Sequence, residues 1–162
     1  MTNREFALRW AQTRTSDLAA HDALYAPDRK FVIELAKVDD HMQDSISNHD
    51  DLQTKLAYWS NTDADSGEGL HTITVTEVFE GSGHIFIHWD YAIEHLASFH
   101  GVPTENKTLS TVASTFLEFD PDGLIIQEAT IINDNRIYQQ LGLPIITPHY
   151  WDEGFDISSL AG

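Results

Sequence analysis

Residues 84–96 read HIFIHWDYAIEHL, and their side chains alternate with the period of two that is typical of a β-strand. One face of this predicted strand is apolar and carries Ile85, Ile87, Trp89, Tyr91 and Ile93. The opposite face is mixed and carries His84, Phe86, His88, Asp90, Ala92 and Glu94. A long strand with one apolar face predicts a sheet that packs one side against a core.

Further segments with strand character lie on both sides of this stretch. The turn Gly81-Ser82-Gly83 separates it from an alternating segment at residues 73–79. Residues 107–119 and 124–132 follow, joined by the tight turn Asp120-Pro121-Asp122-Gly123. Hairpin connections of this kind predict a sheet of four consecutive antiparallel strands. One earlier strand is expected at residues 30–35.

Three helices are expected before the sheet. The first begins with a capping box formed by Thr2 and Glu5, and the second ends before Pro27. The third follows Asp50 and Asp51, two acidic residues that suit the first turn of a helix. Helices that precede such a sheet belong on one of its faces.

A short helix at residues 136–141 follows the last strand, with Asn133 or Asp134 as its cap. These elements together predict a single α+β domain over residues 1–162. In it, a cone-shaped, curved antiparallel sheet packs against three N-terminal helices and is closed by the short C-terminal helix. A curved sheet that is covered by helices encloses an interior pocket, which is the place to expect a ligand.

The composition excludes several classes of function. The chain has 26 acidic and 9 basic residues, a formal net charge of −17, so it lacks the clustered Lys and Arg that bind nucleic acid or anionic membranes. It has no Cys, which excludes disulfides and thiolate chemistry and suits a reducing compartment. We see no signal-peptide or membrane-spanning run, and therefore expect a cytoplasmic protein.

No cofactor is expected from the motifs. The nine His residues do not show the spacing of a strong metal site, so we expect no bound metal. A glycine-rich phosphate-binding loop is also missing from the sequence, which leaves a nucleotide cofactor without support.

Three short motifs in the second half resemble a known family. They are HLASFHGVPT at residues 95–104, FDPDGLI at residues 119–125 and QLG at residues 140–142. These motifs and the order of elements are similar to those of the SnoaL-like polyketide cyclases, within the nuclear-transport-factor-2-like or ketosteroid-isomerase-like superfamily. The resemblance implies a cone fold with an apolar pocket. Proteins of such folds include cyclases, isomerases, dehydratases, epoxide hydrolases and binding modules.

The resemblance also suggests where a catalytic acid would lie. The family's acid is an Asp about ten residues after the hairpin glycine, and counting from Gly123 reaches Asn133. Asn133 cannot transfer a proton, so Asp134 is the candidate acid, provided that the end of the strand turns its side chain inward. A carboxyl group in an apolar pocket can hold and deliver a proton near neutral pH. The alternative role of Asp134 is that of a helix cap.

His88 and Asp90 share one face of the predicted strand. A carboxylate beside an imidazole raises its pKa and makes an acid–base pair, so both are candidate catalytic residues that would support Asp134. The alternative is that both face solvent, because the opposite face is the more apolar one. The candidate substrate-binding residues are Tyr25, Asp28, Trp59, Phe86, His95 and Asn133. Trp59 and Phe86 are also typical core residues, and His95 could instead hold its loop in place.

We therefore expect a small-molecule pocket protein. The favoured function is a cofactor-free acid–base cyclase or isomerase for a hydrophobic keto compound of the polyketide or steroid kind. The first alternative is a non-catalytic ligand-binding or assembly module, and the second is a dehydratase or epoxide hydrolase. The last two predicted strands contain no Arg, which argues against epoxide hydrolysis. The apolar odd-numbered face of residues 84–96 needs a cover, from which we expect a homodimer through the sheet.

Overall fold

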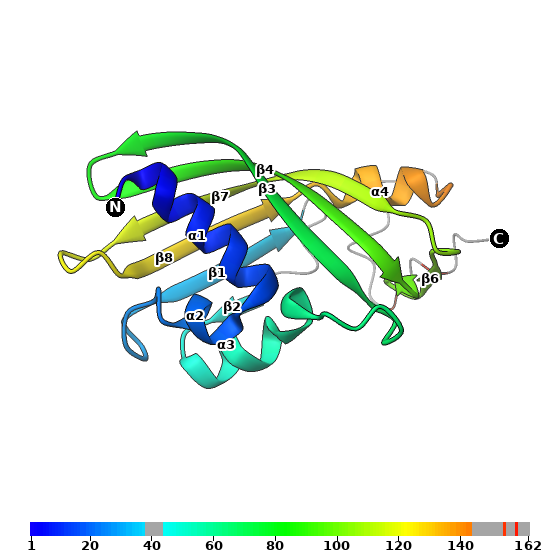
Figure 1. Cartoon of the computed structure of the whole chain (residues 1–162), viewed down its shortest axis with the longest axis horizontal. Helices are drawn as coiled ribbons and strands as arrows, with labels where there is room; N and C mark the ends of the chain where they lie inside the picture. The colour runs from blue at the N-terminus through cyan, green and yellow to red at the C-terminus, as the bar shows by residue number, and fades with distance from the viewer. Residues whose placement is uncertain (38–43, 144–153, 155–157, 159–162) are drawn as a thin grey trace.

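The computed structural model describes residues 1–37, 44–143, 154 and 158. Its elements follow one another along the chain as shown in Figure 1. The helices are α1 (Asn3–Ser16), α2 (Leu18–Asp22), α3 (His49–Lys55), the 3-10 helix η1 (Ala57–Ser60) and α4 (Asp134–Gln140). The strands are β1 (Val32–Lys37), β2 (Asp44–Ile46), β3 (Glu68–Gly81), β4 (His84–Leu96), β5 (Ser98–Phe99), β6 (Val102–Pro103), β7 (Leu109–Phe119) and β8 (Ile125–Ile132). None of the helices in these ranges has the length and hydrophobicity that crossing a membrane requires.

Six strands form the main sheet, in the order β2-β1-β8-β7-β4-β3. The hairpins β3–β4, β4–β7 and β7–β8 pair antiparallel, as the turns in the sequence predict. β1 departs from this pattern because it pairs parallel with β8, so the sheet is mixed. Parallel neighbours require a long crossover, and here residues 38–124 lie between the two strands. The helices α1, α2 and α3 gather on one face of the sheet, which makes the α+β architecture, and α4 lies at one end of the sheet (Figure 1).

A bulge in β3 sets the curvature of the two longest strands. The register between β3 and β4 shifts at Thr76, whose hydroxyl donates to the carbonyl of His88 at 2.9 Å. One extra residue on one strand bends it and increases its twist. The shift also turns Val78 toward the inner face, where it pairs with Ile87. Both strands therefore follow the curve of the core.

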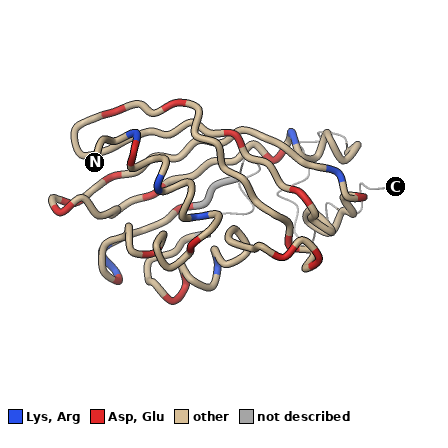
Figure 2. Tube along the Cα trace, viewed as in Figure 1, with Lys and Arg blue, Asp and Glu red and all other residues tan. Residues whose placement is uncertain are grey.

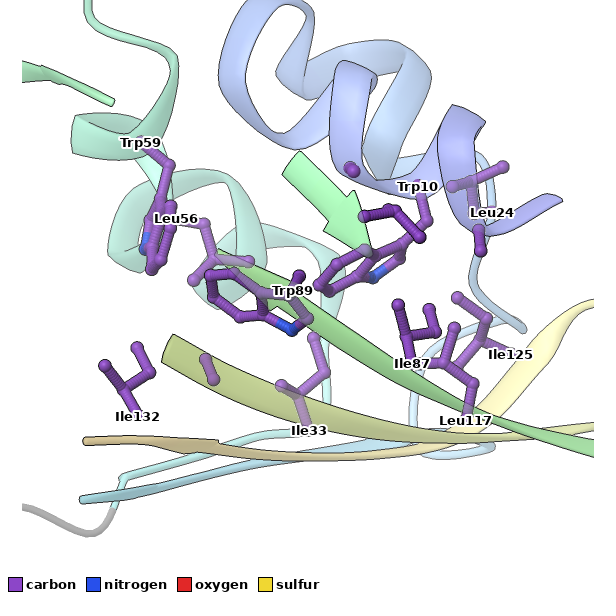
Figure 3. Close-up of a cluster of buried hydrophobic side chains, with 14 of the residues drawn as sticks. Trp10, Leu24, Ile33, Leu56, Trp59, Ile87, Trp89, Leu117, Ile125 and Ile132 are labelled. Carbon is purple, nitrogen blue, oxygen red and sulfur yellow. The ribbon is translucent and has the colours of Figure 1, made fainter. Parts of the chain in front are cut away.

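The core lies between the inner face of the sheet and the helices. The odd-numbered side chains of β4 from Ile85 to Ile93 are buried, and Trp89 lies between Trp10 of α1 and Trp59 of η1 (Figure 3). The ring centroids of Trp89 are 6.0 Å from Trp10 and 6.2 Å from Trp59. Their burial contributes roughly 1.5–3 kcal/mol for each large apolar side chain.

This arrangement corrects one argument from the sequence. The odd-numbered face of β4 needs no partner subunit, because the domain's own helices cover it. Phe86, one of the candidate core and pocket residues, lies on the opposite face and is 39 % exposed. Alternation separates the two faces of a strand but does not say which of them the helices cover.

His49 joins three segments at the helical end of the molecule. Its Nδ1 lies 2.5 Å from Asp22 Oδ1, and its backbone N–H donates to Asp28 at 2.9 Å. Partial burial opposes the charged imidazole, but the hydrogen bond and charge of Asp22 outweigh this effect and raise the pKa of His49 above its ordinary value of 6.5. The protonated ring therefore stabilises the fold.

The raised pKa of His49 determines how its contribution to stability varies with pH. A raised pKa gives stability that is fully present below the ordinary value and is lost as the pH rises through the folded value. We expect His49→Gln to lower the free energy of unfolding by roughly 0.5 kcal/mol at acidic pH and by less above the folded pKa. Urea unfolding across this pH window measures the difference. A constant difference at every pH would contradict the assignment.

Candidate functional site

A cavity of about 210 Å³ opens between the inner face of the sheet, η1, the start of α4 and the β5–β6 hairpin. Six of its lining residues carry rings, namely Tyr58, Trp59, His71, Tyr91, Phe99 and His100. The other lining residues are Glu68, Ile93, Leu96, Ser98, Ile132 and Asp134. An apolar wall with few polar groups is typical of a small-molecule site.

Asp134 is the first residue of α4 and its carboxyl lies in this cavity wall, with only 3 % of the residue exposed. The inward series along β8 is Glu128, Thr130 and Ile132, and Asp134 continues it at the next even position. Asn133 between them is half-buried and holds the corner through its backbone. Its N–H donates to Val112 O, and its carbonyl accepts from the Thr111 hydroxyl.

Tyr91 and His71 form a hydrogen-bonded pair in the same wall. His71 Nε2 lies 3.0 Å from the carbonyl of Glu68, which can only accept, so Nε2 carries the proton. His71 Nδ1 is then an acceptor, and the Tyr91 hydroxyl donates to it at 2.6 Å. Burial lowers the pKa of His71, which keeps the ring neutral near neutral pH. Burial also raises the pKa of Tyr91 well above its usual range, and the nearby Tyr58 and Asp134 raise it further.

A second polar cluster lies deeper in the core, and the sequence analysis missed its two charged members. Glu128 and Arg14 are both fully buried, and Arg14 Nη1 lies 2.7 Å from Glu128 Oε1. Glu128 also accepts from Tyr25, Trp10 and Thr130. Although burial opposes its charge, Arg14, His21 and the hydrogen bond from Tyr25 hold the pKa of Glu128 below its ordinary value.

Two sequence signals could have found this cluster. Arg14 lies four residues after Trp10, which itself follows Phe6 by four, so all three share one face of α1. Glu128 is a charge in the middle of an otherwise apolar strand. Arg14 also stacks near the Trp59 ring, with its guanidinium carbon 4.8 Å from the ring centroid. The cluster thus supports one wall of the cavity.

Among Trp59, Tyr25 and Asp28, which were proposed as binding residues, only Trp59 lines the cavity. Trp59 lines the cavity, as expected for a pocket residue. Tyr25 belongs instead to the buried cluster, where its hydroxyl lies 2.5 Å from Glu128 and 3.1 Å from His21. Asp28 lies outside the cavity and accepts from the backbone of His49.

His88 and Asp90 lie on the outer face of the sheet, so the expectation that they support Asp134 in one pocket is wrong. Asp90 is exposed, and His88 is half-buried with its Nδ1 2.8 Å from the Ser114 hydroxyl. Asp90 lines a separate outer hollow of about 240 Å³ with Arg136 and several hydroxyl groups. Because neighbouring side chains of a strand point to opposite faces, the inward Tyr91 leaves Asp90 outside.

Phe86, His95 and Asn133 also lie outside the lining of the cavity. Phe86 belongs to the outer face of β4, and His95 is an exposed residue at its end. His95 has φ +56°, a left-handed conformation that turns the chain from β4 toward the β5–β6 hairpin. Its position is therefore that of a turn residue, which was the alternative to a pocket role.

No family model matches the sequence, and none of the curated proteins is detectably similar to it. A hypothetical protein from Catenulispora acidiphila, solved with trimethylamine and described as having a ketosteroid-isomerase-like fold, superimposes with a TM-score of 0.63. It is 18% identical, and the match covers 88% of this chain and 96% of that one. This chain has the ketosteroid-isomerase-like fold.

Two further solved structures superimpose on this chain to a similar extent. A phenazine biosynthesis-related protein from Pseudomonas aeruginosa has a TM-score of 0.66 and 20% identity, with 94% of this chain and 87% of that chain covered. A protein from Shewanella putrefaciens described as a SnoaL-like polyketide cyclase has a TM-score of 0.67 and 14% identity, with 88% and 87% covered. These similarities agree with the fold that the motifs implied.

Proposed function

We propose that this protein is a cofactor-free acid–base enzyme, a cyclase or isomerase, that acts on a small hydrophobic keto compound in the aromatic cavity. The observation that carries the proposal is the buried carboxyl of Asp134 in the cavity wall. A positioned carboxyl in a site of low polarity is a typical general acid–base group. The description of the Shewanella protein as a polyketide cyclase supports carbonyl chemistry in this fold. The trimethylamine complex of the Catenulispora protein supports binding of a small molecule.

The chemistry needs one group that moves a proton. The Asp134 carboxylate would take a proton from the carbon next to the keto group, which leaves an enolate. In an isomerase, the same carboxyl returns the proton to a different carbon. In a cyclase, the enolate carbon attacks a second carbonyl of the same molecule, and the carboxyl delivers its proton to the new alkoxide. The cavity would hold the two carbons together, which lowers the entropic barrier.

Trp59 is the candidate donor to the keto oxygen. Its indole Nε1 is buried and has no hydrogen-bond partner among the described residues, and the residue lines the cavity. A preorganised N–H group stabilises an enolate oxygen more than it stabilises the neutral ketone. Tyr91 is less suited to this role because its proton is directed at His71.

The volume of the cavity suggests the size of the substrate. An enclosed apolar cavity of about 150 Å³ is sufficient for benzene. At about 210 Å³, the cavity suits a compound of one or two rings better than a steroid.

Proton exchange in heavy water tests the proposal without knowledge of the natural substrate. Bicyclic ketones such as 1-tetralone would be incubated with the protein in D₂O, and loss of the proton signal next to the carbonyl would be followed by NMR. Faster exchange than in buffer, abolished in Asp134→Asn, is the expected result. Ligand binding without any acceleration, across a panel of one- and two-ring ketones, would instead indicate the non-catalytic binding module.

We also propose that the protein forms a homodimer through the outer face of the sheet. Phe79, Phe86 and Phe116 form a row across β3, β4 and β7, since each is the register partner of the next. Phe79 is 56 % exposed, and Ile131 on β8 is 54 % exposed. Exposed apolar side chains that adjoin one another on a sheet favour association.

Phe86→Ser is therefore expected to weaken the dimer by about tenfold or more in Kd, because it removes the centre of this row. Analytical ultracentrifugation at several concentrations measures the change. Leu8→Ser on α1 is the matched control, since Leu8 is 46 % exposed but α1 lies on the opposite face of the sheet (Figure 1). A wild-type protein that stays monomeric at all concentrations would refute the proposed interface. Added salt should strengthen the dimer, because each copy carries a formal charge of −17.

A further inference from the structure

The aromatic side chains of the cavity form two groups that come from different parts of the chain. Trp59 and Tyr91 pack with ring centroids 4.8 Å apart, and Tyr58 adjoins Trp59 at 5.6 Å. Phe99, from the β5–β6 hairpin, belongs to a separate group with its ring 4.4 Å from that of His100. The cavity is lined by both groups. The faces of such rings carry partial negative charge and attract cations.

The charged groups of the cavity have the same sign. Glu68 and Asp134 supply carboxyl groups, and no Lys or Arg is among the described residues that line the cavity. Arg14 is buried beside Trp59, but its charge is compensated by Glu128 at 2.7 Å. The wider surface is also acidic, with Asp and Glu on most elements and only scattered Lys and Arg (Figure 2).

We propose that the cavity selects a ligand with a compact positive charge, such as a quaternary or protonated tertiary amine, over a neutral molecule of the same shape. Aromatic rings combined with a carboxylate are the usual means by which proteins bind such cations. The inference rests on the proposed function in one respect, namely that this cavity is the place where the ligand binds. A positive charge near a carbonyl also makes the adjacent C–H group more acidic, so it would assist the proton transfer assigned to Asp134.

Choline and 3,3-dimethyl-1-butanol are the probes for this test, because they have the same shape and differ in one charge. Their dissociation constants would be measured by isothermal titration calorimetry at physiological ionic strength, where charges beyond about 8 Å are screened. We expect choline to bind about tenfold more tightly than the alcohol. Equal affinity, or tighter binding of the alcohol, would overturn the proposal.

Two substitutions locate the preference in the cavity. Asp134→Asn removes a charge and nearly keeps the shape of the side chain, and Tyr58→Leu removes a ring from a residue that is 40 % exposed. Each substitution should weaken the binding of choline several-fold and leave the affinity for the alcohol nearly unchanged. Asp122→Asn, at the exposed tip of the β7–β8 hairpin, is the control that removes the same charge far from the cavity.

The control decides between a specific site and general attraction of cations to an acidic protein. If Asp122→Asn weakens the binding of choline as much as Asp134→Asn does, the preference for a cation is not a property of the cavity and the proposal fails. Melting curves of each variant identify any loss of folding, and Tyr58→Leu then still tests the ring contribution. Ketone exchange without choline preference would refute only this inference. Choline preference without exchange on any ketone would refute only the proposed catalysis.

Discussion

Replacing Glu128 by Ala is expected to lower the free energy of unfolding by about 3–5 kcal/mol, because the change leaves Arg14 charged and buried without its partner. Arg14 and Glu128 are both 0% exposed, so water cannot replace the lost interaction. Tyr25 and Trp10 also lose the acceptor of their hydrogen bonds. Urea unfolding followed by tryptophan fluorescence measures the loss.

A paired replacement distinguishes the cost of an unpaired charge from the net contribution of the pair. Arg14→Met combined with Glu128→Leu removes both charges and keeps the volume approximately constant. We expect this double variant to be more stable than either single variant, since apolar replacements of buried ion pairs are often nearly neutral. A double variant as unstable as the sum of the single ones would show that the two residues act independently.

The ion pair also determines part of the acid sensitivity of the fold. The pKa of Glu128 is lowered from its ordinary value of 4.5, so its contribution to stability is present above that value and is lost as the pH falls through the folded pKa. The difference between the wild type and Glu128→Gln should therefore shrink at low pH. A difference that grows on acidification would contradict the direction of this pKa shift.

Asp134→Asn is expected to reduce turnover of any ketone substrate by about 10²–10⁴-fold while leaving the fold intact. The amide has nearly the shape of the carboxyl but cannot transfer the proton, and the residue keeps its place at the start of α4. Turnover and substrate affinity would be measured separately, because the loss should fall on kcat far more than on KM.

Asp90→Asn is the matched control for this experiment. Asp90 carries the same carboxyl but lies on the outer face of β4. We expect its replacement to leave turnover within about twofold of wild type, because a distant exposed charge is screened at physiological salt. Loss of activity in Asp90→Asn with retention in Asp134→Asn would reverse the assignment and place the chemistry in the outer hollow.

The fold was largely predictable because its main signals are local. The alternation of β4, the tight turn at Asp120–Gly123 and the capping box at Thr2 each depend on neighbouring residues, and the structure contains all three. The pairing of β1 with β8 depends on residues far apart, and no local pattern reports it. The three-residue β2 and two-residue strands β5 and β6 are too short to show a period.

The site was predictable at one residue and not at others. Asp134 faces the cavity because it lies two residues after the inward-facing Ile132. The sequence does not show where β8 ends, because the corner at Asn133 is a feature of the three-dimensional structure. For His88 and Asp90, the sequence defined the face they share but not the side that the helices cover. Buried charges such as Glu128 are rare, and its partner Arg14 lies 114 residues away.

That separation has a consequence for synthesis of the protein on the ribosome. Arg14 emerges 114 residues before Glu128, and β8, the parallel partner of β1, is translated together with Glu128. The buried Arg14 of α1 therefore lacks its partner until β8 has been translated. Long-range contacts of this kind slow folding and prolong exposure to aggregation. Nascent chains arrested before residue 128 should accordingly remain sensitive to protease over α1, and those arrested well beyond it should become resistant.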